Sequence, residues 1–166
     1  QAYGQDSNSV SIDPVYVSED TLVPLALVLD NLGTPIAGIT DDINGTNRSE
    51  TTPDMGAIEF SVSGTPLSGI YVLGAGADAD YDSISKALND LSIYGISGPI
   101  TFNIQAGTYD DPVALGQVYG ASATNTITFQ SEDANADNVI WENTANSSAS
   151  NYVLKLNGTD HITLKN

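Results

Sequence analysis

The segment Gly98-Pro-Ile-Thr-Phe-Asn-Ile104 contains the short apolar pattern that decides the fold. Its Ile-Thr-Phe motif begins at Ile100, recurs at Ile127, and returns as Ile-Thr-Leu at Ile162. These intervals of 27 and 35 residues are typical of one or more turns of a solenoid that has several strands in each turn. Strands are accordingly expected at residues 100–104, 126–130, 139–141, 152–156 and 162–164.

A β-sandwich also consists of short strands separated by frequent turns, so it is the alternative architecture. One helix is expected over residues 82–91, with an apolar face made of Ile84, Ala87, Leu88 and Leu91. Asp80 or Asp82 is expected to cap the first N–H groups of this helix, because an acid suits its positive end. A single helix just before the first strand of the repeat favours the solenoid, whose open end needs a cap. We therefore expect an all-β fold with one short capping α-helix.

The composition limits the classes of partner. Among 166 residues there are 21 acidic and four basic ones, which gives a net charge of −17. Such a chain is poorly suited to nucleic acid or to an anionic membrane, because both require Lys and Arg. It attracts divalent cations, and Ca²⁺ prefers carboxylate and carbonyl oxygens. There is no cysteine, so neither a disulfide nor a thiolate metal site is possible. The apolar run from Leu22 to Leu29 is short and interrupted by Pro24, so no membrane insertion is expected.

The first third of the chain has a different pattern. Short strands are expected at Ile36–Ile39 and Met55–Phe60, on either side of a polar loop. Residues 61–68 are small and polar and contain Pro and Gly, which is typical of a linker. The strand pattern begins again near Tyr71. A segment typical of the end of a β-rich unit thus precedes one typical of its start, so we expect the chain to be a piece of a longer array.

Two parts of the chain, each made of two segments, resemble a known family. Asp42–Arg48, followed by Pro53–Phe60, resembles the C-terminal pattern of right-handed parallel β-helix proteins, of pectate-lyase-like type, that Bacteroidota secrete. Tyr81–Leu88 and Gly98–Ile104 resemble the capping helix and first rung of the same fold. One departure is Asn44, where the family usually has Asp. The resemblance implies an extracellular or outer-surface protein exported by the type IX route, and it is specific for fold rather than for activity.

This resemblance also implies a division of the chain. Residues 1–60 are expected to be the C-terminal end of one β-helix unit, and residues 61–70 a linker. Residues 71–166 are expected to contain the capping helix and the first rungs of a second β-helix unit.

Four residues near the presumed ending are candidate metal ligands: Asp41, Asp42, Asn44 and Asp54. Their side chains suit Ca²⁺. No Glu occupies the twelfth position of an EF-hand register, so that motif is excluded. The competing interpretation, which the residue types favour, is a loop whose Asp and Asn side chains accept hydrogen bonds from their own backbone. Ca²⁺ is the only cofactor that the sequence suggests.

Arg48 is the only arginine, and we expect it to act as a structural clamp with Glu59, beside Asp54, through a bidentate pair. No catalytic residue is expected. Asp110 and Asp111 are adjacent and point apart on a strand, whereas glycoside hydrolysis needs two carboxylates that face each other. His161 lies in a Gly-Thr-Asp-His segment and is expected to have a structural role there, as a turn residue or a stacked residue.

Three functions are consistent with the sequence. The first is a non-enzymatic extracellular structural or adhesin segment for surface display and contact with glycans or cells, whose partners are neighbouring repeats of the same chain or subunits. The second is a fragment of a polysaccharide lyase or glycoside hydrolase whose catalytic rungs lie elsewhere. The third is a self-assembling extracellular filament subunit. The absence of a basic or paired-acid cluster favours the first.

Overall fold

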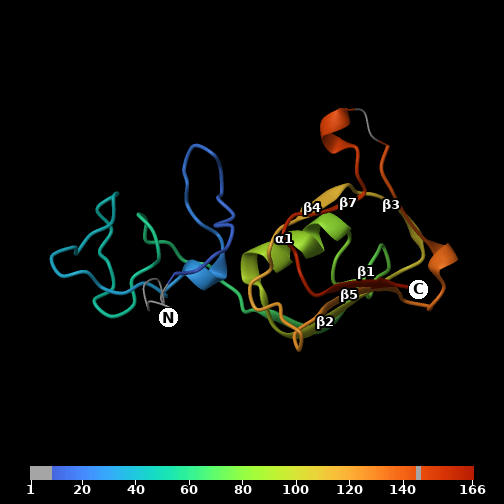
Figure 1. The fold of residues 1–166 in the computed structure, drawn as a ribbon, viewed down its shortest axis with the longest axis horizontal. Helices are drawn as coiled ribbons and strands as arrows, with labels where there is room; N and C mark the ends of the chain where they lie inside the picture. The colour runs from blue at the N-terminus through green and yellow to red at the C-terminus, as the bar shows by residue number, and fades with distance from the viewer. Residues whose placement is uncertain (1–8, 145–146) are drawn as a thin grey trace, which may run out of the picture.

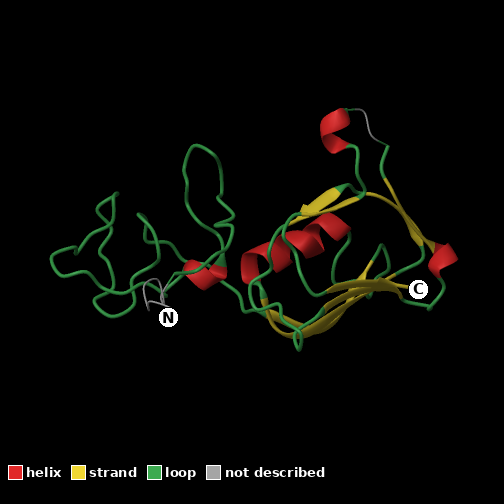
Figure 2. Cartoon of the chain, viewed as in Figure 1, coloured by secondary structure: helices red, strands yellow, loops and turns green. Residues whose placement is uncertain are grey.

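The computed structural model describes residues 9–144 and 147–166, and most of its regular elements are short strands (Figures 1 and 2). The strands are β1 (Leu67–Leu73), β2 (Ile96–Ile104), β3 (Gly107–Asp110), β4 (Val113–Leu115), β5 (Ile127–Ser131), β6 (Val139–Glu142), β7 (Leu154–Leu156) and β8 (Ile162–Lys165). The helices are α1 (Ile84–Tyr94) and the 3-10 helices η1 (Leu27–Leu29), η2 (Ala136–Asn138) and η3 (Ser148–Ser150). The expected class, mainly β with one α-helix, is confirmed. In the described ranges no helix has the length and apolarity to cross a membrane.

All pairings between these strands are parallel. They form a four-stranded sheet in the order β1-β2-β5-β8 and two two-stranded sheets, β3-β6 and β4-β7. Figure 1 shows β4 and β7 on one side of α1, and β1, β2 and β5 on the other. The chain therefore passes through β2, β3 and β4, and then returns through β5, β6 and β7 to pair with each in turn. A sandwich requires antiparallel sheets, so that alternative is excluded.

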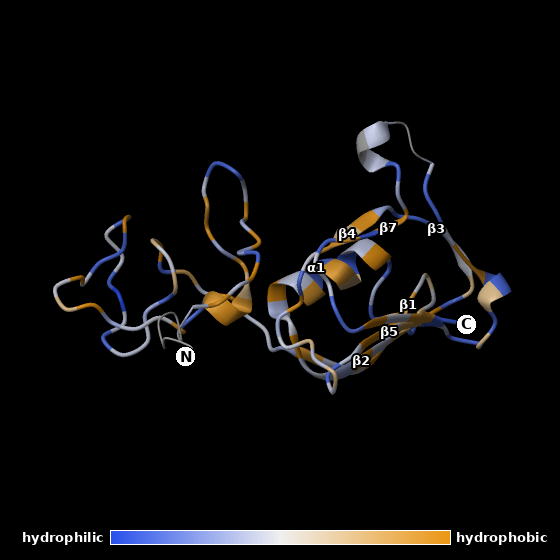
Figure 3. Ribbon diagram, in the orientation of Figure 1, coloured by the Kyte–Doolittle hydropathy of each residue, from blue (hydrophilic) through white to orange (hydrophobic). Residues whose placement is uncertain are grey.

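The copies of the recurring Ile-Thr-Phe motif lie side by side in the larger sheet and show its register. Ile100 pairs with Ile127, which pairs with Ile162, and Phe102 pairs with Phe129. Side chains alternate between more and less buried positions along β2 and β5, and Figure 3 shows alternating colours there. The rings of Phe102 and Phe129 stack with centroids 4.9 Å apart and planes 15° apart. Equivalent residues of successive passages therefore pack on one another.

Helix α1 packs its apolar face into the same core. The residues predicted for this face, Ile84, Ala87, Leu88 and Leu91, are all buried. The helix ends at Gly95, whose φ of 64° suits glycine, and a side chain there would collide with the Tyr119 carbonyl oxygen.

The predicted helix caps need correction. The N-cap residue is Ser83, which makes no side-chain cap hydrogen bond. Asp111, from the turn between β3 and β4, accepts a hydrogen bond from the Ser85 backbone N–H at 2.7 Å. Asp80 instead accepts from the Val72 N–H at 2.8 Å, and Asp82 pairs with Lys86. A distant residue supplies the cap because tertiary packing brings the Asp111 turn to the helix start.

Residues 9–66 contain η1 and one isolated antiparallel bridge, between Asp41 and Asn47, but no strand. The strands expected at Ile36–Ile39 and Met55–Phe60 are therefore absent. The backbone of the second segment bonds to η1 and to a loop instead of a neighbouring strand: the Met55 N–H donates to the Leu29 carbonyl, and the Ala57 carbonyl accepts from the Ile43 N–H. The expected first unit also includes residues 1–8, which lie outside the described residues.

The linker is shorter than expected. Strand β1 begins at Leu67, inside the expected linker of residues 61–70, because Leu67 is buried and pairs with Ile96. Residues 61–66 then connect the loop-rich segment to the strand-rich part, and Val62 is held by a hydrogen bond from its N–H to Asp30 at 2.9 Å.

Candidate functional site

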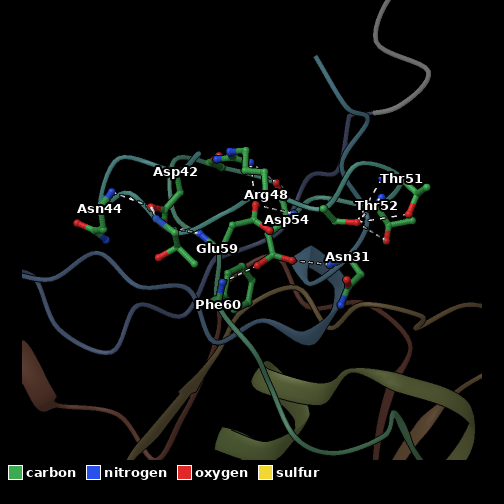
Figure 4. Close-up of polar contacts among 12 residues, drawn as sticks. Asn31, Asp42, Asn44, Arg48, Thr51, Thr52, Asp54, Glu59 and Phe60 are labelled. Atoms are coloured by element: carbon green, nitrogen blue, oxygen red, sulfur yellow. Dashed lines mark hydrogen bonds and ion pairs between the residues drawn. The ribbon is translucent and has the colours of Figure 1, made fainter. Parts of the chain in front are cut away.

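The loops of residues 41–60 contain four charged side chains that are mostly removed from water (Figure 4). Asp42 is 9 % exposed and Asp54 is 4 % exposed. The side chains of Arg48 and Glu59 are each 13 % exposed. Charged groups that are shielded from water need hydrogen-bonding partners. The partners of these four side chains therefore indicate their roles.

Asp42 organises the loop that follows it. One carboxylate oxygen, Oδ1, accepts hydrogen bonds from the backbone N–H groups of Asn44 and Thr46, both at 2.8 Å. The other oxygen, Oδ2, accepts from the Glu59 N–H at 2.9 Å. These bonds lower the pKa of Asp42 below its ordinary value, and the bond from the Glu59 N–H has the largest effect, although burial opposes the shift. Asp42 is thus held ionised while it joins two segments of the loop.

Asp54 joins two other segments. Its Oδ1 accepts a hydrogen bond from the Asn31 N–H at 2.7 Å, and its Oδ2 accepts from the Phe60 N–H at 2.5 Å. Asn31 follows η1 and has a φ of 58°, in the left-handed region that Asn tolerates better than most residues. Asp54 therefore holds the end of the loop region against the chain that leaves η1.

Arg48 bonds to one side chain and two backbone carbonyls. Its Nη1 donates to Glu59 Oε1 at 2.9 Å and to the Asp54 carbonyl at 3.2 Å, and its Nη2 donates to the Gly56 carbonyl at 2.6 Å. Glu59 Oε1 also accepts from the Asp54 N–H at 3.1 Å. The expected clamp between Arg48 and Glu59 is present, but it is not bidentate on a carboxylate, because the second guanidinium nitrogen binds the loop backbone.

The four candidate metal ligands are not assembled into a ligand set. Both oxygens of Asp42 and both oxygens of Asp54 accept backbone N–H groups, while Asp41 lies in the bridge with Asn47. Over residues 9–144 and 147–166, no three His, Cys, Asp or Glu side chains are arranged to hold a metal ion. The arrangement corresponds to the competing interpretation, in which Asp side chains accept bonds from nearby backbone groups.

The other candidate acids also bond to the backbone. Asp110 accepts from the Thr144 N–H at 3.0 Å, and Asp111 caps α1. His161 has a φ of 60° and its carbonyl accepts from the Ile127 N–H, which places it in the turn before β8. None of these three residues faces a second carboxylate or a nucleophile in the contacts of the described chain.

Two acids with structural roles, Asp30 and Asp133, were not predicted from the sequence. Asp30 binds the Val62 N–H, and Asp133 accepts hydrogen bonds from Ser131, Asn135 and Asn138 in the turn before β6. These hydrogen bonds lower the pKa of Asp133 below its ordinary value, and the bond from the Ser131 hydroxyl has the largest effect. An Asp followed by small polar residues was the only available signal for such turns, and it does not reveal partners 32 residues away.

A cleft of about 570 Å³ lies beside this network, between residues 14–29 and residues 43–58. Its walls are mainly apolar and include Leu22, Leu29, Met55 and Ile58, with Tyr16 as the one titratable side chain. The lining of this cleft is therefore suited to apolar contacts, and the adjoining network holds the loop backbone.

Comparison with known proteins gave no match: no family model, no curated protein and no solved structure is similar to this chain.

Proposed function

We propose that this chain is a non-enzymatic segment of an extracellular right-handed parallel β-helix protein, which serves as a stiff spacer for display at a bacterial cell surface. The observation that carries the proposal is the in-register parallel pairing of β2, β5 and β8, repeated in the two smaller sheets. Parallel strands joined by crossovers in this order support a coil that can be extended by further passages. We place the chain with the secreted Bacteroidota proteins that residues 42–60 resemble.

The polar network supports a structural role for the loop-rich segment. Asp42, Asp54, Arg48 and Glu59 make most of their hydrogen bonds with backbone groups of residues 31–60, and Arg48 also bonds to the Glu59 carboxylate. A segment with little regular secondary structure needs such contacts, because its backbone N–H and carbonyl groups lack ladder partners. We propose that this segment closes one β-helix unit and that residues from β1 onward begin the next.

A binding role follows from repetition in the proposed array. Single contacts of such a rod with glycans or cells are weak, and many copies in one protein raise the overall affinity. The partners in this proposal are therefore neighbouring repeats and surface glycans, and not nucleic acid.

Two experiments test the proposal. Antibodies raised against this chain should label intact source cells, and external protease should remove the label. Labelling only after permeabilisation would contradict an extracellular location. The purified chain should release no reducing ends or unsaturated sugars from neutral or acidic polysaccharides, with or without Ca²⁺. Measurable turnover that survives repurification would reject the non-enzymatic role.

A further inference from the structure

Two copies of the tripeptide Asn-Gly-Thr occur in the chain, at residues 44–46 and at residues 157–159. The asparagine and the glycine of each copy are exposed. The glycines have nearly equal φ angles, 82° for Gly45 and 81° for Gly158, and a Cβ on either would meet nothing within 4 Å. Because the two copies share local sequence, glycine conformation and exposure, a difference in their chemistry must come from their hydrogen bonds and neighbouring charges.

An Asn-Gly step allows the backbone to attack the asparagine side chain. The backbone nitrogen of the glycine loses its proton to solvent and forms a bond to Cγ of the asparagine. The bond from Cγ to Nδ2 breaks, and Nδ2 takes up a proton and leaves as ammonia. Water then opens the five-membered succinimide ring at either carbonyl, which gives aspartate or isoaspartate without any change of oxidation state. Glycine favours the reaction because it has no Cβ to hinder the approach.

The attacking nitrogen of the first copy is engaged. The Gly45 N–H donates to the Asp42 carbonyl at 3.1 Å. On either side of it, the N–H groups of Asn44 and Thr46 donate to the Asp42 carboxylate, both at 2.8 Å. The reactive geometry requires that this loop break hydrogen bonds, and the nearby negative charge opposes removal of a proton from the glycine N–H. These contacts therefore protect the first copy.

The attacking nitrogen of the second copy has no such contacts. The Gly158 N–H donates to no acceptor in the described part of the chain. The residues on either side of it are held, because the Asn157 N–H donates to the Leu115 carbonyl at 2.8 Å and the Thr159 hydroxyl donates to the Gly116 carbonyl at 2.7 Å. The turn between β7 and β8 thus presents a glycine nitrogen that is available for attack.

This availability does not come from the place of the turn in the last described passage. Leu115 pairs with Leu156, so Gln117 takes the place in the preceding passage that Gly158 takes here. The later passage lies beside Gln117, yet the Gln117 N–H donates to no acceptor among the described residues. The N–H at this position of the turn therefore lies outside the ladder even where a further passage is present.

We propose that Asn157 is a site of spontaneous deamidation, whereas Asn44 in the same tripeptide is protected. The product has a carboxylate in place of a neutral amide, so it adds one negative charge to a chain whose net charge is −17. The isoaspartate form also lengthens the main chain at residue 157 by one methylene group, which strains the bonds that hold the turn to Leu115 and Gly116. The modification is independent of the proposed spacer function, so the cell-labelling and polysaccharide experiments do not bear on it.

The test follows both sites in the intact 166-residue chain, incubated at neutral to mildly alkaline pH and sampled over days. Trypsin cuts after Arg48, Lys155 and Lys165, so the two asparagines fall in separate peptides, residues 1–48 and 156–165, for mass spectrometry. Conversion should be at least about threefold faster at Asn157 than at Asn44, because reaction at Asn44 requires a hydrogen bond to break. The same chain in concentrated urea is the matched control, and there the two sites should convert at similar rates. Equal rates in the folded chain, or faster conversion at Asn44, would overturn the proposal.

Two substitutions test the cause of the difference. Asp42→Ala removes the carboxylate that holds the first loop, so conversion at Asn44 should approach that at Asn157. Gly158→Ala places a methyl group beside the attacking nitrogen and should slow conversion at Asn157 by about fivefold or more, with Asn44 unchanged. Circular dichroism checks that each variant is folded. Unchanged conversion at Asn44 in folded Asp42→Ala, or at Asn157 in folded Gly158→Ala, would contradict the proposal.

Discussion

The charged side chains of the loop-rich segment act mainly on backbone groups. Asp42 and Asp54 each join parts of the chain that are far apart in sequence, and Arg48 binds two carbonyls besides Glu59. Hydrogen bonds to charged groups are stronger than those between neutral groups. In a segment without strands, these few side chains replace the ladder that would otherwise fix the backbone.

Loss of the Arg48 guanidinium should destabilise the chain strongly. Arg48→Met leaves Glu59 with a nearly buried, unpaired charge, and we expect a loss of about 2 kcal/mol or more in the free energy of unfolding. Urea unfolding measures the change. The matched control is Lys86→Met, which removes an ion pair whose side chains are 65 % and 66 % exposed, and it should have little effect. Equal effects of the two substitutions would contradict the clamp.

Acid should weaken the same loops. Backbone hydrogen bonds, above all that from Glu59, hold the pKa of Asp42 below its ordinary value of 3.8, so the folded chain releases this proton more readily than the unfolded chain. The stabilisation is fully present above about pH 4 and is lost as the pH falls through the lower folded pKa. Asp42→Asn should remove part of this dependence in unfolding curves measured between about pH 2 and pH 6. The exposed variant Glu19→Gln is the control, and an unchanged acid limb in Asp42→Asn would refute this account.

The start of α1 depends on an element that is distant in sequence. The turn between β3 and β4 supplies Asp111 to the Ser85 N–H, so the helix and the first passage of strands stabilise each other. An acid near the first turn also suits the positive end of the helix.

Removal of this cap should cost about 1 kcal/mol. Asp111→Ala is the test, measured by thermal unfolding, and its main-chain carbonyl can still accept the hydrogen bond from Trp141. Asp82→Ala is the control, because Asp82 pairs with the exposed Lys86 and does not cap the helix. A larger loss for Asp82→Ala than for Asp111→Ala would restore the cap expected from the sequence.

The turn before β5 has a glycine that cannot be replaced without a collision. Gly120 has a φ of 85°, and a Cβ there would lie 1.9 Å from the Ile96 carbonyl oxygen. Gly158 has a nearly equal φ of 81°, but a Cβ there meets nothing within 4 Å. Gly158→Ala should cost about 1–2 kcal/mol from backbone strain alone, and Gly120→Ala clearly more. Equal losses in urea unfolding would show that the close approach to Ile96 is not maintained.

The whole molecule is extended: the loop-rich segment lies beside the strand-rich part instead of around it (Figures 1 and 3). Its accessible surface is 9920 Å², whereas a compact chain of this mass exposes about 7,800 Å². Residues 61–66 join the two parts, and most of them are exposed.

Limited proteolysis should therefore cut first in this connection. A protease of broad specificity should release a resistant fragment that begins near Leu67, because β1 is paired with β2 and its first and last residues are buried. Asp30→Ala should accelerate the cut, since it frees the Val62 N–H. Mass spectrometry of the fragments over time measures both effects. Cuts between Leu67 and Glu142 that precede any cut in residues 61–66 would contradict a separate strand-rich part.

Much of the strand-rich part was predictable, for a local reason. The repeat at Ile100, Ile127 and Ile162 alternates apolar and polar residues, and this alternation fixes both the strands and the face that each buries. The apolar face of α1 follows in the same way from its spacing. The pairing of Arg48 with Glu59 was also predictable, because Glu59 is one of the few acids that follow Arg48 within the same short segment.

The remaining features depended on contacts between distant segments. The sequence by itself determined the strands of the repeat, the apolar face of α1 and the strongly acidic character of the chain, because these follow from the order and charge of neighbouring residues. Only the tertiary structure decided that Asp111 caps α1, that Met55–Phe60 forms loops instead of a strand, and that Asp42 and Asp54 bind backbone amides instead of forming a ligand set. The physical reason is that a buried polar group takes whichever partner folding brings within hydrogen-bonding distance, and that partner has no fixed separation along the chain.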